Sequence, residues 1–319
     1  MKKVIPIFFA VNECYVPYLS VAIVSLIDNA SDKYNYNIHI IHENIKESSK
    51  KKLKALETDN VKIMLTEMHN SLESITNRIE NQLRADHFTL TIYYRIFLPF
   101  MFKEYDKAIY IDADTCVTGD ISELYNIDLK DNLFAGCNDI SCQYSDILCN
   151  YFANHAGLTI DKYINSGVLL MNMKKLREIN FESKFLKILN EYHFDTVCPD
   201  QDYINAMAKG KILYLPNEWD AMPTGGNLVF DNPKICHYNL FLKPWHYDKI
   251  DYEDYFWNYV ELSPFKKEII KEKAEFNESN RKEDDKGMEI LLSRADAIAK
   301  SDLTFKKVFG DKDILMEVE

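Results

Sequence analysis

The sequence predicts an α/β fold built on a parallel sheet. Strand and helix patterns alternate over residues 4–65, and a short apolar run at 108–111 ends abruptly at two aspartates. With 319 residues, 47% of them hydrophobic and 13% aromatic, the chain can bury the core of one large α/β domain plus a smaller appendage. We therefore expect a globular protein rather than a disordered one.

The alternation begins at the N-terminus. The pattern predicts a buried strand at Val4–Val11, a helix at Tyr15–Asn29, a strand at Tyr36–His42, a polar helix at Glu47–Leu56 and a third strand at Val61–Leu65. This order is typical of a parallel sheet of the nucleotide-binding type. No Gly-x-Gly-x-x-Gly follows the first strand and the sequence has no Gly-Lys-Ser/Thr loop, so we expect neither a dinucleotide fold nor a P-loop.

The stretch 108–120 is the most informative part of the chain. Its apolar run is short enough for one buried strand, and Asp112 and Asp114 follow directly. Ligands of open α/β sheets bind at the carboxyl ends of the strands. Two carboxylates there repel each other unless a cation lies between them, and a hard divalent metal ion suits that role. The alternative is a solvated turn rich in aspartate.

Two elements on either side of this strand carry further polar groups. A helix is expected over Leu90–Phe102, a bulky apolar stretch interrupted by Arg95. An arginine in such surroundings pairs with an acid or binds an anionic ligand; the alternative is a purely structural ion pair. A strand at Leu133–Asn138 is expected to end at Asp139.

Two later segments continue this series. Asn165 heads the apolar run Tyr163–Met173, where its amide needs hydrogen-bond partners such as sugar hydroxyls, unless it merely forms a turn. A helix is expected over Pro199–Ala208. Asp200 and Asp202 lie in its first turn, where capping alone would explain two acids.

The last predicted strands supply a histidine and a lysine. Ile212–Leu215 and Lys234–His237 both have strand character, and Lys243 follows six residues after His237. A structural role is the alternative for a single histidine at a strand end. Together with the two aspartates, His237 forms an oxygen and nitrogen ligand set suited to Mn²⁺ or Mg²⁺ with open positions for a diphosphate. Such a site without a P-loop predicts a departing nucleoside diphosphate, as in sugar transfer.

Charge and composition exclude several classes of function. The net charge of −12 argues against nucleic acid or an anionic membrane as the main partner. No apolar segment is long enough for a membrane span, and no small-residue cleavage site follows the apolar N-terminal stretch. Seven scattered cysteines indicate neither a disulfide framework nor a zinc site. We expect a mature N-terminus and a cytoplasmic protein, with peripheral contact at the inner membrane face left open.

The chain changes character after about residue 262. Residues 261–319 contain 12 Lys and Arg against 15 Asp and Glu, with apolar residues at helical spacing. We expect a catalytic domain at 1–262 and a helical extension at 263–319, with Lys282–Lys286 as a solvated loop. The extension could dock on the domain, on a second copy or on a membrane face; its lack of net positive charge weakens the membrane option. The oligomeric state is left open.

These motifs, in this order and at this spacing, resemble those of glycosyltransferase family 8, which includes bacterial lipooligosaccharide α-galactosyltransferases and glycogenin. The resemblance runs from about residue 3 to 250. It rests on Phe9-Ala10-Val11-Asn12 with Tyr15, Tyr93-Tyr94-Arg95, Tyr110-Ile111-Asp112-Ala113-Asp114, Asn165-Ser166-Gly167-Val168-Leu169-Leu170, Asp200-Gln201-Asp202, and His237 with Lys243-Pro244-Trp245-His246.

The resemblance implies a GT-A fold, which is a mixed, mostly parallel sheet with helices on both sides, and retaining transfer from a UDP-sugar with Mn²⁺ or Mg²⁺. It implies metal ligands at Asp112, Asp114 and His237. It also implies a uridine pocket, a diphosphate contact and a donor-sugar site. The uridine pocket would be formed by Ala10, Asn12 and Tyr15, and the diphosphate contact by Lys243. The donor-sugar site would be formed by Arg95, Asn165, Asp200 and Gln201, with Ala113 as a further donor contact.

Within this resemblance, Gln201 is expected nearest the reacting carbon. An amide is a poor nucleophile, so same-face attack on the sugar is favoured, with Asp139 and Asp200 as alternative catalytic carboxylates. The chain departs from the family pattern at two positions. Leu240 replaces the glycine that a close backbone contact to phosphate would use, and Cys14 stands where some relatives carry asparagine.

The expected function is transfer of glucose or galactose from a UDP-sugar to a glycan or glycolipid acceptor in bacterial surface-glycan assembly. Acceptor contacts are expected in 140–160 and 220–232. Two alternatives remain. Asp112-Ala113-Asp114-Thr115 after an apolar strand also matches the first motif of haloacid-dehalogenase-like phosphatases, although Glu283-Asp284-Asp285 lacks the apolar strand that their later acidic pair follows. A family member that binds UDP-sugar without turnover is the second.

Overall fold

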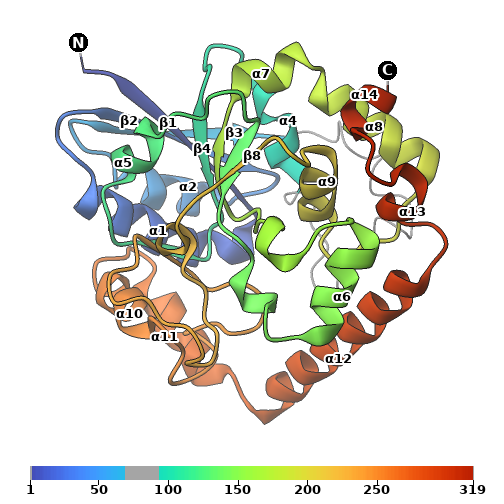
Figure 1. Cartoon of the computed structure of the whole chain (residues 1–319). Coiled ribbons are helices and arrows are strands. Elements are labelled where there is room, and N and C mark those ends of the chain that lie inside the picture. The colour runs from blue at the N-terminus through green and yellow to red at the C-terminus, as the bar shows by residue number, and fades with distance from the viewer. Residues whose placement is uncertain (1, 69–92, 319) are drawn as a thin grey trace.

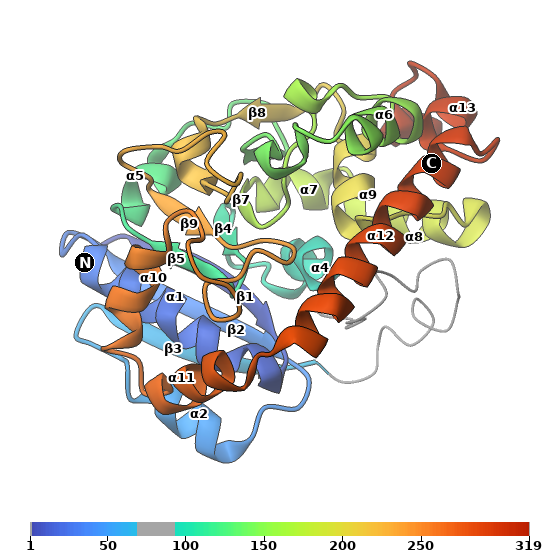
Figure 2. The same ribbon diagram turned by 90° about the horizontal axis from the view of Figure 1, so that it is seen from below.

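A mixed, mostly parallel sheet forms the centre of the molecule. The computed structural model describes residues 2–68 and 93–318. The strands are β1 (Val4–Val11), β2 (Asn35–His42), β3 (Val61–Glu67), β4 (Ala108–Ile111), β5 (Thr115–Val117), β6 (Phe134–Gly136), β7 (Val168–Met171), β8 (Ile212–Tyr214) and β9 (Ile235–His237). Seven of them form the main sheet in the order β3-β2-β1-β4-β7-β6-β8 (Figure 1), and β5 pairs with β9 (Figure 2). Within the main sheet, β7 runs antiparallel to both of its neighbours, β4 and β6.

Helices cover both faces of this sheet. The longer ones are α1 (Val16–Asn29), α2 (Glu47–Lys54), α4 (Tyr94–Met101), α6 (Asp146–His155), α8 (Phe181–Tyr192), α9 (Pro199–Met207), α10 (Glu253–Val260), α11 (Lys266–Glu275) and α12 (Glu278–Lys300). The shorter ones are α5 (Ile121–Asn126), α7 (Met173–Glu178), α13 (Phe305–Phe309) and α14 (Ile314–Glu317). The described part of the chain contains no helix both long and apolar enough to cross a bilayer.

The alternation of side chains along the strands explains the two layers. In β4, Ala108 and Tyr110 pack into one hydrophobic cluster, together with side chains of α4, α7, α8 and α9. Ile109 and Ile111 face the opposite cluster, which contains side chains of α1, α2 and α5. A strand buried on both faces must be apolar at every position, which is why this run reads as continuously hydrophobic.

The short β5–β9 ribbon lies directly after β4. Residues 115–117 pair antiparallel with residues 235–237, and Thr115 stands opposite His237. The backbone therefore brings the end of β9 next to the two aspartates that follow β4.

The C-terminal helices dock on the rest of the chain (Figures 1 and 2). Leu291 and Ala295 of α12 share a cluster with side chains of α6, while Phe305 and Phe309 of α13 join the cluster that contains α4 and α8. A helical C-terminus was expected. The loop predicted at Lys282–Lys286 was wrong, because these residues lie inside α12, where their exposed charges are compatible with a solvated helix face.

The other predicted elements are confirmed, with boundary shifts of a few residues. The helix expected at Leu90–Phe102 is found at Tyr94–Met101, and residues 90–92 lie outside the described part of the chain. The strand expected at Leu133–Asn138 is shorter, at Phe134–Gly136, and the apolar run after Asn165 forms β7. The division at residue 262 stays a prediction.

One buried histidine makes the stability of this fold sensitive to acid. His155 at the end of α6 is 0% exposed, and neither ring nitrogen has a hydrogen-bond partner among the described residues. Its ring stacks on Tyr151, with centroids 4.9 Å apart. Burial lowers the pKa of His155 from 6.5 to about 3, so the folded protein holds this ring neutral.

We therefore expect the free energy of unfolding to fall as the pH drops through 6.5 toward about 3, because the unfolded chain binds a proton that the folded chain refuses. The expected loss from His155 alone is about 2 kcal/mol between pH 7 and pH 5. His155→Phe keeps an aromatic ring and should flatten this part of the curve. Urea unfolding at several pH values measures it; an unchanged slope in the variant would contradict the assignment.

Candidate active site

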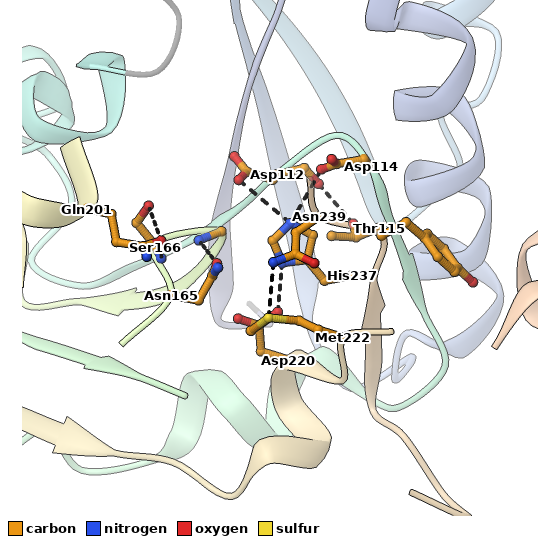
Figure 3. Close-up of polar contacts among 12 residues, drawn as sticks. Asp112, Asp114, Thr115, Asn165, Ser166, Gln201, Asp220, Met222, His237 and Asn239 are labelled. Atoms are coloured by element: carbon orange, nitrogen blue, oxygen red, sulfur yellow. Dashed lines mark hydrogen bonds and ion pairs between the residues drawn. The ribbon is translucent and has the colours of Figure 1, made fainter. Parts of the chain in front are cut away.

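Three side chains with metal-ligand chemistry meet at the carboxyl end of β4. Asp112 and Asp114 follow the strand, and His237 is the last residue of β9 (Figure 3). His237 Nε2 lies 3.9 Å from Asp112 Oδ2 and 3.5 Å from Asp114 Oδ1. One ligand atom from each residue lies within 4.8 Å of the others. Two carboxylates and an imidazole in this arrangement fit Mn²⁺ or Mg²⁺.

The orientation of the imidazole supports the same assignment. His237 Nδ1 lies 2.9 Å from Asp220 Oδ1, so Nε2 is the nitrogen directed at the two aspartates (Figure 3). A carboxylate on the far nitrogen of a ligand histidine fixes its tautomer and ring plane. Asp220 lies at the end of the short 3₁₀ helix Asn217–Asp220 and is 0% exposed. Its Oδ2 has no partner among the described residues.

The sequence did not indicate Asp220. It lies in Asn-Glu-Trp-Asp, a polar segment without a recognisable motif, 17 residues before its histidine partner. Burial raises the pKa of Asp220 to about 6. Burial alone would lower the pKa of His237, but the carboxylates of Asp220 and Asp114 raise it to about 10.

A glycine makes room for this cluster. Gly167, just before β7, has no side chain. A Cβ atom at this position would overlap His237 Cε1 and lie 2.8 Å from Asp112 Oδ2. The Gly167 carbonyl also accepts a hydrogen bond from the Asp112 amide at 2.7 Å. The Asn-Ser-Gly segment therefore has a steric reason for its glycine: any larger residue would displace a proposed metal ligand.

Lys243 lies next to Asp114. Its ammonium group forms an ion pair with Asp114 and also donates to the Tyr238 carbonyl. Burial would raise the pKa of Asp114, but the charges of Lys243 and His237 hold it well below its ordinary value. Burial would lower the pKa of Lys243, but Asp114 raises it, so the lysine stays charged in a buried place. A buried cation beside a metal site can bind phosphate.

The turn before Lys243 keeps a glycine-like backbone without the glycine. Leu240 has a φ of 52°, in the left-handed region that side chains other than Gly, Asn and Asp rarely adopt. The departure from the family pattern at this position thus changes the side chain and leaves the local chain path in the conformation that glycine favours.

Arg95 joins two acids on the other side of the site. Its Nη2 lies 3.0 Å from Asp112 Oδ1 and its Nε 3.0 Å from Asp200 Oδ2, while only 5% of its side chain is exposed. The guanidinium lies 4.3 Å from the centre of the Tyr110 ring. The prediction of an acid partner is confirmed, since Arg95 has two.

Gln201 is held at both ends of its amide. Its Oε1 accepts a hydrogen bond from the Ser166 backbone amide at 3.0 Å (Figure 3), and its Nε2 donates to Asp139 Oδ2 at 2.9 Å. The same Asp139 oxygen accepts from Asn165 Nδ2 at 3.0 Å. Asp139 thus orients both amide side chains toward one region.

Asp202 lies behind this group rather than in it. It is 0% exposed and accepts hydrogen bonds from the Tyr151 and Tyr163 hydroxyl groups at 2.6 and 2.5 Å. Its other contact is the Cys198 amide at 3.1 Å. Asp202 therefore ties the first turn of α9 to α6, which is more than the capping role its position suggested.

All the predicted site residues line one pocket of about 270 Å³. They are Ala10, Asn12, Tyr15, Arg95, Asp112, Ala113, Asp114, Asp139, Asn165, Asp200, Gln201, His237 and Lys243. Asn12 caps the turn that leads into α1, because its Oδ1 accepts from the Tyr15 amide at 3.2 Å. Leu148 of α6 and Leu291 of α12 also line the pocket, and the helical spacing around Leu291 predicted a buried helix face but not a place in the pocket.

Known proteins with similar sequences and structures point in one direction. The sequence model of the family described as "Glycosyl transferase family 8" matches residues 6–249. A putative glycosyltransferase of Haemophilus influenzae is 30% identical over 75% of this chain and 72% of that protein. A lipopolysaccharide 1,2-glucosyltransferase of Escherichia coli is 24% identical over 75% of this chain and 72% of its own length.

The solved structure of the galactosyltransferase LgtC with donor and acceptor sugar analogs superposes with a TM-score of 0.68 at 24% identity, covering 82% of this chain and 96% of that one. This likeness concerns the fold, which is the expected GT-A type.

Proposed function

Because the chain belongs to glycosyltransferase family 8, we propose that it transfers glucose or galactose from a UDP-sugar to a glycan or glycolipid acceptor, with retention of configuration. The observation that carries the proposal is the convergence of Asp112, Asp114 and His237 at one end of a pocket whose other polar groups suit a sugar nucleotide. The name of the Escherichia coli relative, a lipopolysaccharide 1,2-glucosyltransferase, supports a role in surface-glycan assembly.

The chain's own residues divide the pocket into regions with different tasks. Asp112, Asp114 and His237 would hold Mn²⁺ or Mg²⁺, which when bound supplies positive charge for the departing UDP. Lys243 adds a buried positive charge beside them. Asn12 and Tyr15, on the turn after β1, would bind the uridine, with the tyrosine ring on the base.

The region around Gln201 would hold the donor sugar. Neither acid nearby is free to attack the anomeric carbon, because Asp139 Oδ2 accepts from two amides and Asp200 is paired with Arg95. Ser141 donates to the other oxygen of Asp139 at 2.6 Å. A carboxylate whose lone pairs are engaged is a weak nucleophile, which favours same-face attack by the acceptor. The departing phosphate would then take the acceptor proton.

The acceptor would enter from the less polar side of the pocket. Leu148, Leu240, Phe241 and Leu291 line the pocket, and Leu148, Leu240 and Leu291 pack in one apolar cluster. None of these side chains suits the diphosphate or the uracil. Apolar walls of this kind fit the CH-rich face of a sugar ring or the apolar part of a glycolipid. Leu148 lies in the predicted acceptor stretch 140–160, while no residue of the other predicted stretch, 220–232, is among those that line the pocket.

The experiment that tests the proposal is UDP release from a panel of UDP-sugars, with and without Mn²⁺ and without acceptor. Donor hydrolysis that requires metal and prefers UDP-glucose or UDP-galactose would support it. A chain that binds UDP-sugar but never releases UDP, with or without added glycan acceptors, would be a non-catalytic member of the family. The family assignment leaves no reason to retain the phosphatase alternative.

Replacing Gln201 by alanine is expected to lower turnover about a hundredfold while UDP affinity changes less than threefold, roughly the loss expected for one positioned polar group at a reacting centre. The Gln201 amide is held by Ser166 and Asp139, not by Lys243 or the proposed metal ligands. Steady-state kinetics and UDP titration separate the two quantities. Equal losses in both would place Gln201 at the nucleotide instead.

A further inference from the structure

The C-terminal helices hold the segment that carries Lys243. This segment, residues 243–248, is called the lysine loop below. It contacts α1 on one side and α11 and α12 on the other. Trp245 stacks on Tyr18 of α1, with ring centroids 3.8 Å apart. The contacts on the other side come from the extension beyond residue 262.

Helix α11 fixes the backbone of the loop. Lys273 Nζ donates to the carbonyl oxygens of Pro244 at 3.1 Å and Tyr247 at 2.6 Å, and it pairs with Asp248 Oδ1 at 2.8 Å. One ammonium group thus closes the loop from its second residue to its last. Because Pro244 follows Lys243 directly, this closure restricts where the lysine side chain starts.

Two side chains of the loop are held as well. His246 Nε2 lies 3.0 Å from Glu272 Oε1 of α11, and the His246 ring stacks on Phe276 with centroids 4.2 Å apart and planes 9° apart. The Tyr247 hydroxyl donates to Asp284 Oδ2 of α12 at 2.7 Å. The loop therefore has contacts to both helices that go beyond apolar packing.

We propose that α11 and α12 of the C-terminal extension position Lys243 to bind the diphosphate of the sugar nucleotide. The extension then contributes to the donor site. Lys273, Glu272 and Asp284 act through the loop and are positioning residues. This inference rests on the proposed function, since it needs a diphosphate ligand. It assigns the extension a task within its own chain.

The position of Lys243 shows why outside support matters. The lysine is buried and paired with Asp114, so a small shift of its backbone would move the ammonium group relative to both Asp114 and a bound phosphate. Ammonium groups are point charges on flexible stems, and preorganisation of the stem determines how much binding they supply. The same helix α12 presents Leu291 to the pocket, so the extension reaches the site at two places.

The test uses two variants of the full chain with matched controls. Lys273→Ala removes the clamp on the loop backbone, and Asp284→Asn weakens the contact with Tyr247. Lys271→Ala and Asp285→Asn are the controls, because they lie on the same helices, Lys271 with 72% of its side chain exposed and Asp285 exposed. UDP affinity is measured by calorimetry with Mn²⁺ present, and thermal unfolding is measured alongside.

We expect Lys273→Ala to weaken UDP binding about tenfold and Asp284→Asn about threefold, with both controls within twofold of the parent, as for weakened charge-assisted hydrogen bonds. Lys273→Arg keeps a donor and should recover part of the loss. In a Lys243→Ala background, Lys273→Ala should have no further effect, because the residue through which it acts is gone.

Three outcomes overturn the inference. Folded Lys273→Ala protein with UDP affinity within twofold of the parent shows that the clamp does not matter. A full tenfold effect that persists in the Lys243→Ala background shows that the helix acts by another route. If the parent chain itself fails to bind UDP with Mn²⁺, the proposed function falls and this inference falls with it, and that result is recognised from the parent alone.

Discussion

Asp114→Asn protein is expected to transfer sugar about a thousandfold more slowly than the parent, the loss expected when several kcal/mol of leaving-group stabilisation are removed. The substitution keeps the shape of the side chain and removes its charge. In the parent, Asp114 Oδ1 lies 3.5 Å from His237 Nε2, and the Asp114 carboxylate pairs with the ammonium group of Lys243. The amide of the variant would lie beside the same two groups. The positive charge of Lys243 would then face a neutral side chain at the proposed metal site.

Metal affinity distinguishes this explanation from a general loss of structure. Mn²⁺ binding, followed by the paramagnetic signal of the free ion, should weaken at least tenfold in Asp114→Asn and also in His237→Ala. Asp59→Asn is the control, since Asp59 is an exposed aspartate that does not line the pocket. Either site variant with near-parent turnover in the presence of metal would show that the ligand assignment is wrong.

Replacing Arg95 by methionine is expected to have the largest effect on stability, with a loss of about 3–5 kcal/mol in the free energy of unfolding. The guanidinium is almost fully buried and neutralises Asp112 and Asp200, each at 3.0 Å. It also donates to Ser166 Oγ at 3.1 Å. Removing it takes the cation away from the buried carboxylate of Asp200 and the partly exposed carboxylate of Asp112, and UDP binding should fall as well.

A second substitution tests this cause. Asp200→Asn in the Arg95→Met background should restore part of the lost stability, because one of the two uncompensated charges is removed. Arg95→Lys should have a free energy of unfolding below that of the parent, since an ammonium group lacks the planar set of donors that reaches both acids. Urea unfolding measures all four proteins. If Arg95→Met lost less than about 1 kcal/mol of unfolding free energy, the ion pairs of Arg95 with Asp112 and Asp200 would be well solvated in the protein, contrary to this explanation.

The sequence was sufficient for the parts of the site that are tied to strand ends. Asp112 and Asp114 follow a run whose apolar character identifies a strand buried on both faces, and His237 ends another apolar run. Ligands of open α/β sheets bind at the carboxyl ends of the strands, so these terminal polar residues could be grouped by their chemistry without a structure. The sequence did not show that β9 lies with β5 in a second, two-stranded sheet. The family motifs then supplied the pocket residues that lie on turns, such as Asn12.

Contacts between distant, irregular segments could not be predicted in this way. Asp220 reaches His237 through a 3₁₀ turn whose sequence has no period, and its role depends on burial that no local pattern reports. The charged run at 282–286 was interpreted as a loop because strongly polar stretches are common in loops. In α12, Lys282, Glu283, Asp285 and Lys286 are exposed and Asp284 accepts a hydrogen bond from Tyr247, while Leu291 and Ala295 bury another side of the helix.

The β5–β9 ribbon determines when, during folding, the proposed metal ligands can come together. Only three residues of each strand pair, and they come from positions 115–117 and 235–237. A nascent chain that has reached the two aspartates must still be extended through β9 before the imidazole can join them, and closing so long a loop is slow compared with local helix formation. Manganese capture should therefore be among the last events of refolding, and its rate would report when the two halves of the ribbon first meet.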